Sequence, residues 1–175
     1  VLVLAGDICS TSNLHNVLGT LCGRFPHVVY VPGNHEYYGS ERDSVNQAIA
    51  KTQKDNANFH CLMDGAVMIG NQRFIGTTLW FGDEDKRNFP FERSLNDFRY
   101  IKHFRKWVYD VNERSRAFLL QHVQEGDIVV THHLPSWASV PKHLATSQLN
   151  RFYVTNLAEL ILDKKPKLWI HGHTH

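Results

Sequence analysis

Four short polar clusters, each directly behind an apolar run, constrain the fold of this chain more than any other feature. The runs are typical of strands buried on both faces, and they cover residues 1–5, 27–31, 128–131 and 167–170. The clusters behind them are Gly6-Asp7, Gly33-Asn34-His35-Glu36, His132-His133 and His171-Gly172-His173-Thr174-His175. In open α/β sheets, ligands bind beyond the carboxyl ends of the strands. We therefore expect the four clusters to meet at one site.

Helices and further strands occupy most of the remaining sequence. Apolar residues at helical spacing, with varying regularity, predict helices over 13–22, 42–57, 101–123 and 156–162. Short strands are expected around 59–62, 66–70 and 73–80. The last two flank a Gly-Asn-Gln sequence that favours a hairpin turn. This order predicts one α/β domain over residues 1–175, with helices covering a mixed sheet or a pair of sheets.

Residues 81–106 are rich in charged and aromatic side chains and show no regular period, so we interpret them as an excursion from the core. We expect substrate specificity to come from this segment. Its arginines Arg93, Arg99 and Arg105 could bind a second phosphate or a carboxylate, and Arg99 is our candidate substrate-binding residue. A solvated charged surface over buried aromatic residues explains the same pattern.

Composition excludes several classes of protein. The formal net charge of +2 is weaker than nucleic-acid-binding domains usually show, so no nucleic-acid partner is required. No apolar run has the length of a bilayer span, and we expect no membrane partner. The three cysteines lack paired spacing, which argues against disulfides and thiolate zinc sites and favours a reducing, cytoplasmic compartment. The oligomeric state stays open.

The side chains of the four clusters are those of a metal site. Imidazole, carboxylate and amide oxygen without thiolate suit manganese, iron, zinc or nickel. Each cluster alone has a plainer interpretation, because Asp7 and Asn34 fit turns and His132-His133 fits the exposed end of a strand. The pair His173 and His175 is more specific, since side chains two residues apart in an extended segment point the same way. For the chain to have no metal site, the plainer interpretations would have to hold independently at every cluster. The four clusters together therefore favour a metal site.

The clusters occur in the order of the calcineurin-like metallophosphoesterases, and the chain resembles that superfamily from position 6 to position 175. The sequences Gly76-Thr77-Thr78-Leu79-Trp80 and Asn96-Asp97-Phe98-Arg99 are similar to those of a bacterial-type branch. The resemblance implies a mixed β-sheet sandwich flanked by helices, an αββα architecture. It also implies an enzyme, a binuclear metal-dependent phosphoesterase.

The resemblance also assigns roles residue by residue. Asp7 is similar to the carboxylate that bridges two divalent metal ions, and His175 to a ligand of one of them. His35 resembles a catalytic histidine beside the metals that stabilises or protonates the leaving group. The remaining ligands of the other metal are implied to be Asn34, His132 and His173.

The chain departs from the family pattern at both ends. The family's opening Asp-x-His does not occur before Gly6-Asp7, and family members usually continue past Gly-His-x-His. We therefore expect a domain that is incomplete at both ends. Ser10 stands where a second aspartate is often found, and we interpret this change as minor.

The predicted reaction is the hydrolysis of phosphate mono- or diesters in a small phosphorylated substrate. In the implied mechanism, a hydroxide held between two metals attacks phosphorus and His35 assists the leaving group. Two alternatives stay open, a non-catalytic scaffold that keeps the fold and a mononuclear metal hydrolase or oxygenase. Retention of the ligands favours an enzyme, and the combination of an asparagine with His-x-His favours two metals.

Overall fold

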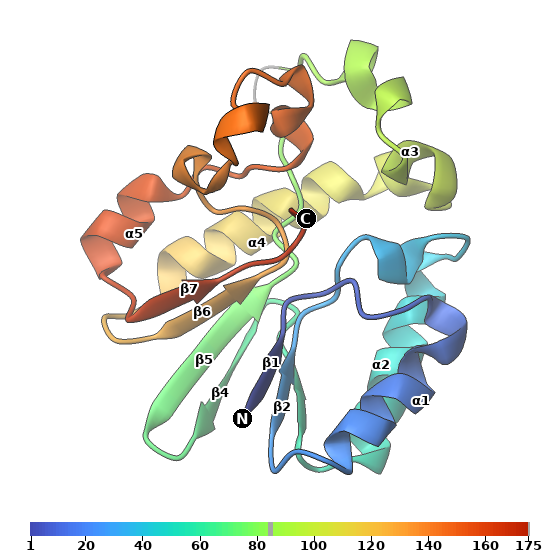
Figure 1. Ribbon diagram of the computed structural model, residues 1–175, viewed down its shortest axis with the longest axis vertical. Coiled ribbons are helices and arrows are strands. Elements are labelled where there is room, and N and C mark those ends of the chain that lie inside the picture. Colours follow the sequence, from blue (N-terminus) through green and yellow to red (C-terminus); the bar gives the residue numbers. More distant parts are fainter. Residues whose placement is uncertain (84–85, 175) are drawn as a thin grey trace.

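The computed structural model describes residues 1–83 and 86–174, and its strands form two separate sheets (Figure 1). The first sheet is entirely parallel and has the order β1 (Leu2–Leu4), β2 (Val28–Tyr30), β3 (Phe59–Cys61). The second sheet has the order β4 (Gly65–Ile69), β5 (Gln72–Thr77), β6 (Ile128–Thr131), β7 (Leu168–Ile170). Only β4 runs antiparallel to its neighbour, through the predicted hairpin turn.

Helices cover the outer face of each sheet (Figure 1). On the first sheet lie α1 (Thr11–Cys22) and α2 (Arg42–Asp55), whose buried leucines and valines pack against Tyr30 and Phe59. On the second lie α4 (Val108–His122) and α5 (Ala158–Lys164), which bury Leu119 and Leu160 against Ile75. A third apolar cluster fills the space between the sheets. These four layers confirm the predicted αββα sandwich.

Strand register places the predicted clusters at one end of the sandwich. Leu4 pairs with Tyr30 in the first sheet, and Val130 pairs with Ile170 in the second, so the carboxyl ends of these strands are level. In Figure 1 the chain's amino terminus lies at the opposite end of the sandwich. The loops that follow β1, β2, β6 and β7 can therefore approach one another.

The predicted helix over 101–123 is wrong in its first turns, because α4 begins only at Val108. His103 has a left-handed backbone with φ of 56°, which interrupts a right-handed helix. The backbone N–H of Gly39 donates to the carbonyl of Tyr100, and that of Lys102 donates to Ser40. These hydrogen bonds fix the chain before α4 against the loop that follows β2.

The described part of the excursion contains the one-turn helix α3 (Asp97–Tyr100) and 3-10 turns at Phe89–Ser94 and Phe104–Lys106. Phe98 and Phe104 pack edge to face, with ring centroids 5.0 Å apart, and both join the core beside the first sheet. The role of the excursion, residues 81–106, in substrate specificity stays a prediction. In the described ranges, no helix is long and apolar enough to cross a membrane, and the three cysteines are unpaired.

Candidate metal centre

Two glycines allow the loops behind β1 and β2 to meet. Gly6 has a positive φ of 85°, and a Cβ there would overlap the His132 ring and the backbone of Gly33. A Cβ on Gly33 would in turn overlap the carboxylate of Asp7. The close approach brings the backbone N–H of His35 to 2.9 Å from Asp7 Oδ1. Glycine at both positions is therefore a steric requirement of the site.

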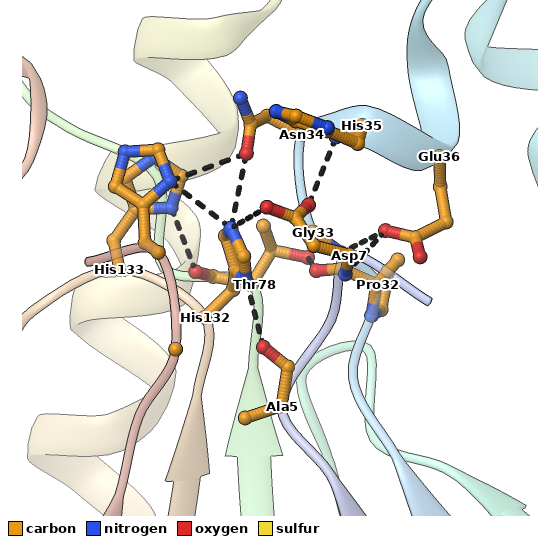
Figure 2. Close-up of polar contacts among 12 residues, drawn as sticks. Ala5, Asp7, Pro32, Gly33, Asn34, His35, Glu36, Thr78, His132 and His133 are labelled. Atoms are coloured by element: carbon orange, nitrogen blue, oxygen red, sulfur yellow. Dashed lines mark hydrogen bonds and ion pairs between the residues drawn. The ribbon is translucent and has the colours of Figure 1, made fainter. Parts of the chain in front are cut away.

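A buried carboxylate, Glu36, joins the same two loops. Its oxygens accept backbone hydrogen bonds from Gly33 at 2.6 Å and Asp7 at 3.0 Å (Figure 2). A further backbone hydrogen bond comes from Ile8 at 2.6 Å. Burial raises the pKa of Glu36, and these backbone donors oppose that effect. Glu36 belongs to one of the four polar clusters of the sequence, but the sequence alone indicated no role for it. Its side chain fixes the loop that carries Asp7 against the loop that carries Asn34.

His132 is completely buried, and its contacts settle which ring nitrogen carries the proton. Nδ1 lies 2.6 Å from the carbonyl oxygen of Ala5, an acceptor, so Nδ1 must donate. Burial lowers the pKa of His132, against the opposing effects of the Asp7 charge and the Ala5 hydrogen bond, which favours a neutral ring. Its Nε2 then presents a lone pair to Asn34 Oδ1 at 3.0 Å and Asp7 Oδ2 at 3.4 Å.

Asn34 presents an oxygen to the same point (Figure 2). Its Nδ2 donates to Asp97 Oδ1 at 2.8 Å, which turns Oδ1 toward the histidines. His173 Nδ1 lies 3.2 Å from this Oδ1 and 3.1 Å from His132 Nε2. The four side chains come from both sheets, so the site spans the sandwich.

These atoms fit a metal ion. One atom each from Asp7, His132 and His173 lie within 4.8 Å of one another. Asp7 Oδ2 is buried and, among the described residues, has no hydrogen-bond partner. A proton on His173 Nδ1 cannot serve Asn34 Oδ1, His132 Nε2 and Asp7 Oδ2 together, whereas a cation can. Asp7 and His173 also have positive φ angles of 59° and 68°, a strain typical of functional sites.

A cavity of about 170 Å³ opens above this cluster. Asp7, Asn34, His35 and His173 line it, together with residues 94–97 of the excursion. The side chain of His35 is exposed and stacks on Tyr38, with ring centroids 4.6 Å apart. The cavity therefore places an imidazole and a candidate metal site around one space.

Comparison with known proteins gives this arrangement a family. The sequence profile of the calcineurin-like phosphoesterases matches residues 1–175. The chain belongs to the calcineurin-like phosphoesterase family. This family consists in general of metal-dependent phosphoesterases, and it includes non-catalytic members.

One similar sequence and one similar solved structure accompany the family match. An uncharacterised protein, L509, of Acanthamoeba polyphaga mimivirus is 24% identical over 205 residues, covering 99% of this chain and 71% of that protein. One solved crystal structure is similar with a TM-score of 0.56 and 16% identity, over 94% of this chain. The chain spans 57% of the length of that solved protein, and the likeness supports the fold.

The structure brings together five of the residues predicted for a calcineurin-like site, namely Asp7, Asn34, His35, His132 and His173. His175 lies outside the described residues. Arg99 does not line the site cavity, and instead lines a separate cavity of about 470 Å³ with Arg93 and Arg105. Its role in substrate binding stays a prediction.

Three side chains at the calcineurin-like site escaped sequence reasoning. Besides Glu36, these are Asp97 and Tyr38, which contact the nitrogen end of Asn34. Asp97 belongs to a sequence that is similar to the bacterial-type branch, and this similarity is the one feature that could have drawn attention to it. The similarity does not say what Asp97 does. His133, by contrast, lies behind the site against Trp80, at a ring distance of 5.1 Å, and its Nδ1 contacts the carbonyl of Thr78.

Proposed function

We propose that this chain hydrolyses phosphate mono- or diesters of small substrates with two divalent metal ions. The observation that carries the proposal is the convergence of Asp7 Oδ2, Asn34 Oδ1 and His132 Nε2 below an open cavity. A shared cation would satisfy three acceptor atoms held this close in a mostly buried site, which supports the proposal. Manganese, iron, zinc or nickel would suit these donors.

Asp7, Asn34, His132 and His173 would hold one ion, and Asp7 with His175 would contribute to the second. When bound, the ions supply Lewis-acid chemistry that activates water and neutralises phosphate oxygens. The protein's own part is to hold these donors in place, and the fixed His132 ring and the Glu36 bridge support that role. A preformed donor set needs little reorganisation during the reaction.

His35 would act on the leaving group. His35 is exposed and lines the cavity, while its backbone N–H is bound to Asp7 Oδ1. A protonated imidazole there would donate its proton to the departing alkoxide oxygen. Stacking on Tyr38 restricts the ring and supports this orientation.

The cavity size supports a small phosphorylated substrate, and no nucleic-acid partner is required. Arg99 lies in the second cavity, so it would contact a part of the substrate remote from the reacting phosphate. The excursion lines both cavities, which supports its proposed role in specificity. The unpaired cysteines support a reducing, cytoplasmic compartment.

The test is metal content and turnover in the same preparations. The wild-type protein, loaded separately with manganese, iron, zinc or nickel, should hydrolyse 4-nitrophenyl phosphate or its bis ester. Asp7→Asn should lose metal and turnover together while keeping its circular dichroism spectrum. Metal binding without turnover of either ester by the wild type would favour the non-catalytic scaffold. Normal metal content and turnover in Asp7→Asn would overturn the proposed site.

A further inference from the structure

Asp97 stands out because it is a buried acid of the excursion that contacts Asn34, a side chain of the candidate metal site. It begins α3, lies 63 residues after Asn34 in sequence, and is only 1% exposed. Its Oδ1 accepts two hydrogen bonds, from Asn34 Nδ2 at 2.8 Å and from the Tyr38 hydroxyl at 2.7 Å. The Tyr38 oxygen also lies 3.3 Å from Asn34 Nδ2, so the three side chains form a closed triangle.

The orientation of the Asn34 side-chain amide determines whether an oxygen or an N–H group faces the metal site. The oxygen and nitrogen ends of asparagine have nearly the same shape, but only the oxygen can bind a cation. The reversed amide would direct two N–H donors at the metal site. At Asn34 the nitrogen end meets Asp97 and Tyr38, and the oxygen end meets His132 at 3.0 Å and His173 at 3.2 Å. An ionised carboxylate accepts hydrogen bonds and cannot donate them, so it selects the nitrogen end.

We propose that Asp97, supported by Tyr38, is a positioning residue that holds the Asn34 amide with its oxygen toward the metals. The inference rests on the proposed function, because the orientation matters for metal binding only if Asn34 is a ligand. It gives the excursion a second task besides specificity. The segment that shapes the cavity wall would also determine whether the metal site is competent to bind.

The decisive measurement is metal affinity by calorimetric titration of manganese and zinc into metal-free protein. Asp97→Ala removes the acceptor and should weaken binding about 10- to 100-fold, the usual effect of losing a partner that orients a metal ligand. Asp97→Asn keeps the shape of the side chain but adds a donor, so it no longer selects the nitrogen end of Asn34 and should also weaken binding, by no more than Asp97→Ala does. Metal affinity in Asp97→Ala equal to that of the wild type would overturn the proposal.

A second arm uses Asn34→Asp. A carboxylate offers an oxygen from either end, so it has no orientation for Asp97 to fix. Asp97→Ala should therefore weaken metal binding in the Asn34 protein and have no effect, or strengthen binding, in the Asn34→Asp protein. A role of Asp97 in stability alone would produce the same loss in both backgrounds, and that result would also overturn the proposal.

Asp127→Ala provides the matched control for stability. Asp127 is also a buried aspartate with a short ion pair, 2.8 Å to Arg73, but it precedes β6 at the opposite end of the strand from His132. Its loss should lower the melting temperature and leave metal affinity unchanged. Absence of metal binding in the wild type would defeat the proposed function itself. Normal wild-type binding with normal binding by Asp97→Ala would defeat only the inference on Asp97.

Discussion

Two pairs of histidines lie at opposite ends of this protein, and their rings are almost equally close. His132 Nε2 and His173 Nδ1 are 3.1 Å apart at the carboxyl ends of β6 and β7, whereas His27 Nδ1 and His60 Nε2 are 3.3 Å apart at the start of β2 and in β3. The His27–His60 rings are half-buried and stacked, with centroids 5.6 Å apart. Proximity of two imidazoles therefore does not distinguish the pairs.

The difference lies in what else faces the rings. Within the described residues, the bond between the two rings is the only side-chain hydrogen bond of His27 or His60, and one ring proton satisfies it. Around His132 and His173, Asn34 Oδ1 and Asp7 Oδ2 are two further acceptors. A single ring proton shared by these two histidines cannot also satisfy both oxygens. Surplus acceptors held in place by the fold therefore distinguish the candidate cation site from a pair of neighbouring histidines.

The largest effect is expected for His132→Ala. Removing a buried ligand should reduce metal affinity by more than about 100-fold, beyond the loss expected for an orienting partner, and bring phosphatase turnover to the background rate. The double variant His27→Ala and His60→Ala should keep metal affinity and turnover. Titration calorimetry with an aryl phosphate assay would check both, and a metal loss in the double variant would remove the distinction between the pairs.

His35→Ala should separate metal binding from chemistry. The variant should retain metal, because His35 contacts Asp7 only through its backbone N–H, yet lose on the order of 10²–10⁴ in turnover. The loss should shrink for esters of acidic phenols, whose leaving groups need little protonation. Reduced metal content in the purified variant would instead make His35 a ligand.

Glu36→Ala should test whether the Glu36 carboxylate, which fixes the loops that carry Asp7 and Asn34, supports metal binding. In the described part of the chain, the His27–His60 pair has no such support. One buried and two part-buried backbone N–H groups would lose their acceptor, which should lower the free energy of unfolding by about 1–3 kcal/mol and weaken metal binding. Glu92→Ala is the matched control, because Glu92 is a buried glutamate of the excursion that accepts a hydrogen bond from Tyr109 of α4. Denaturant unfolding should show a loss in both variants, whereas only Glu36→Ala should change metal affinity.

The smallest effect is expected from acid at the His27–His60 pair. Burial, and then the neighbouring His27, lower the pKa of His60 in the folded state. The unfolded chain therefore takes up this proton more readily, and stability falls as the pH drops through the unfolded value of about 6.5. His27→Gln removes one cause, so its melting temperature should fall less than that of the wild type between about pH 7.5 and 5.5. If the melting temperature of His27→Gln fell as much as that of the wild type, or more, His27 would not be a cause of the lowered pKa of His60.

Sequence reasoning reached the layers, and it anticipated that residues of the four clusters lie close together, because both follow from strand order. Asp7, Asn34, His132 and His173 each follow a strand, and parallel pairing levels the ends of those strands within each sheet. Of these strands, β2 and most of β6 are buried as predicted, whereas β1 and β7 are at most half-buried. The role of Asp97 could not be predicted, since it depends on a contact 63 residues away and on one end of an amide. The start of α4 was missed because the left-handed His103 leaves no signal in a hydrophobic pattern.

The metal cluster joins residues that leave the ribosome far apart in time. His173 is 139 residues beyond Asn34, and synthesis at about 5–20 residues per second separates their appearance by roughly 7 to 28 seconds. The first sheet needs only residues up to Cys61, so Asp7 and Asn34 can be in place while their partners do not yet exist. Metal loading would therefore be a late event in biogenesis that marks completion of both sheets.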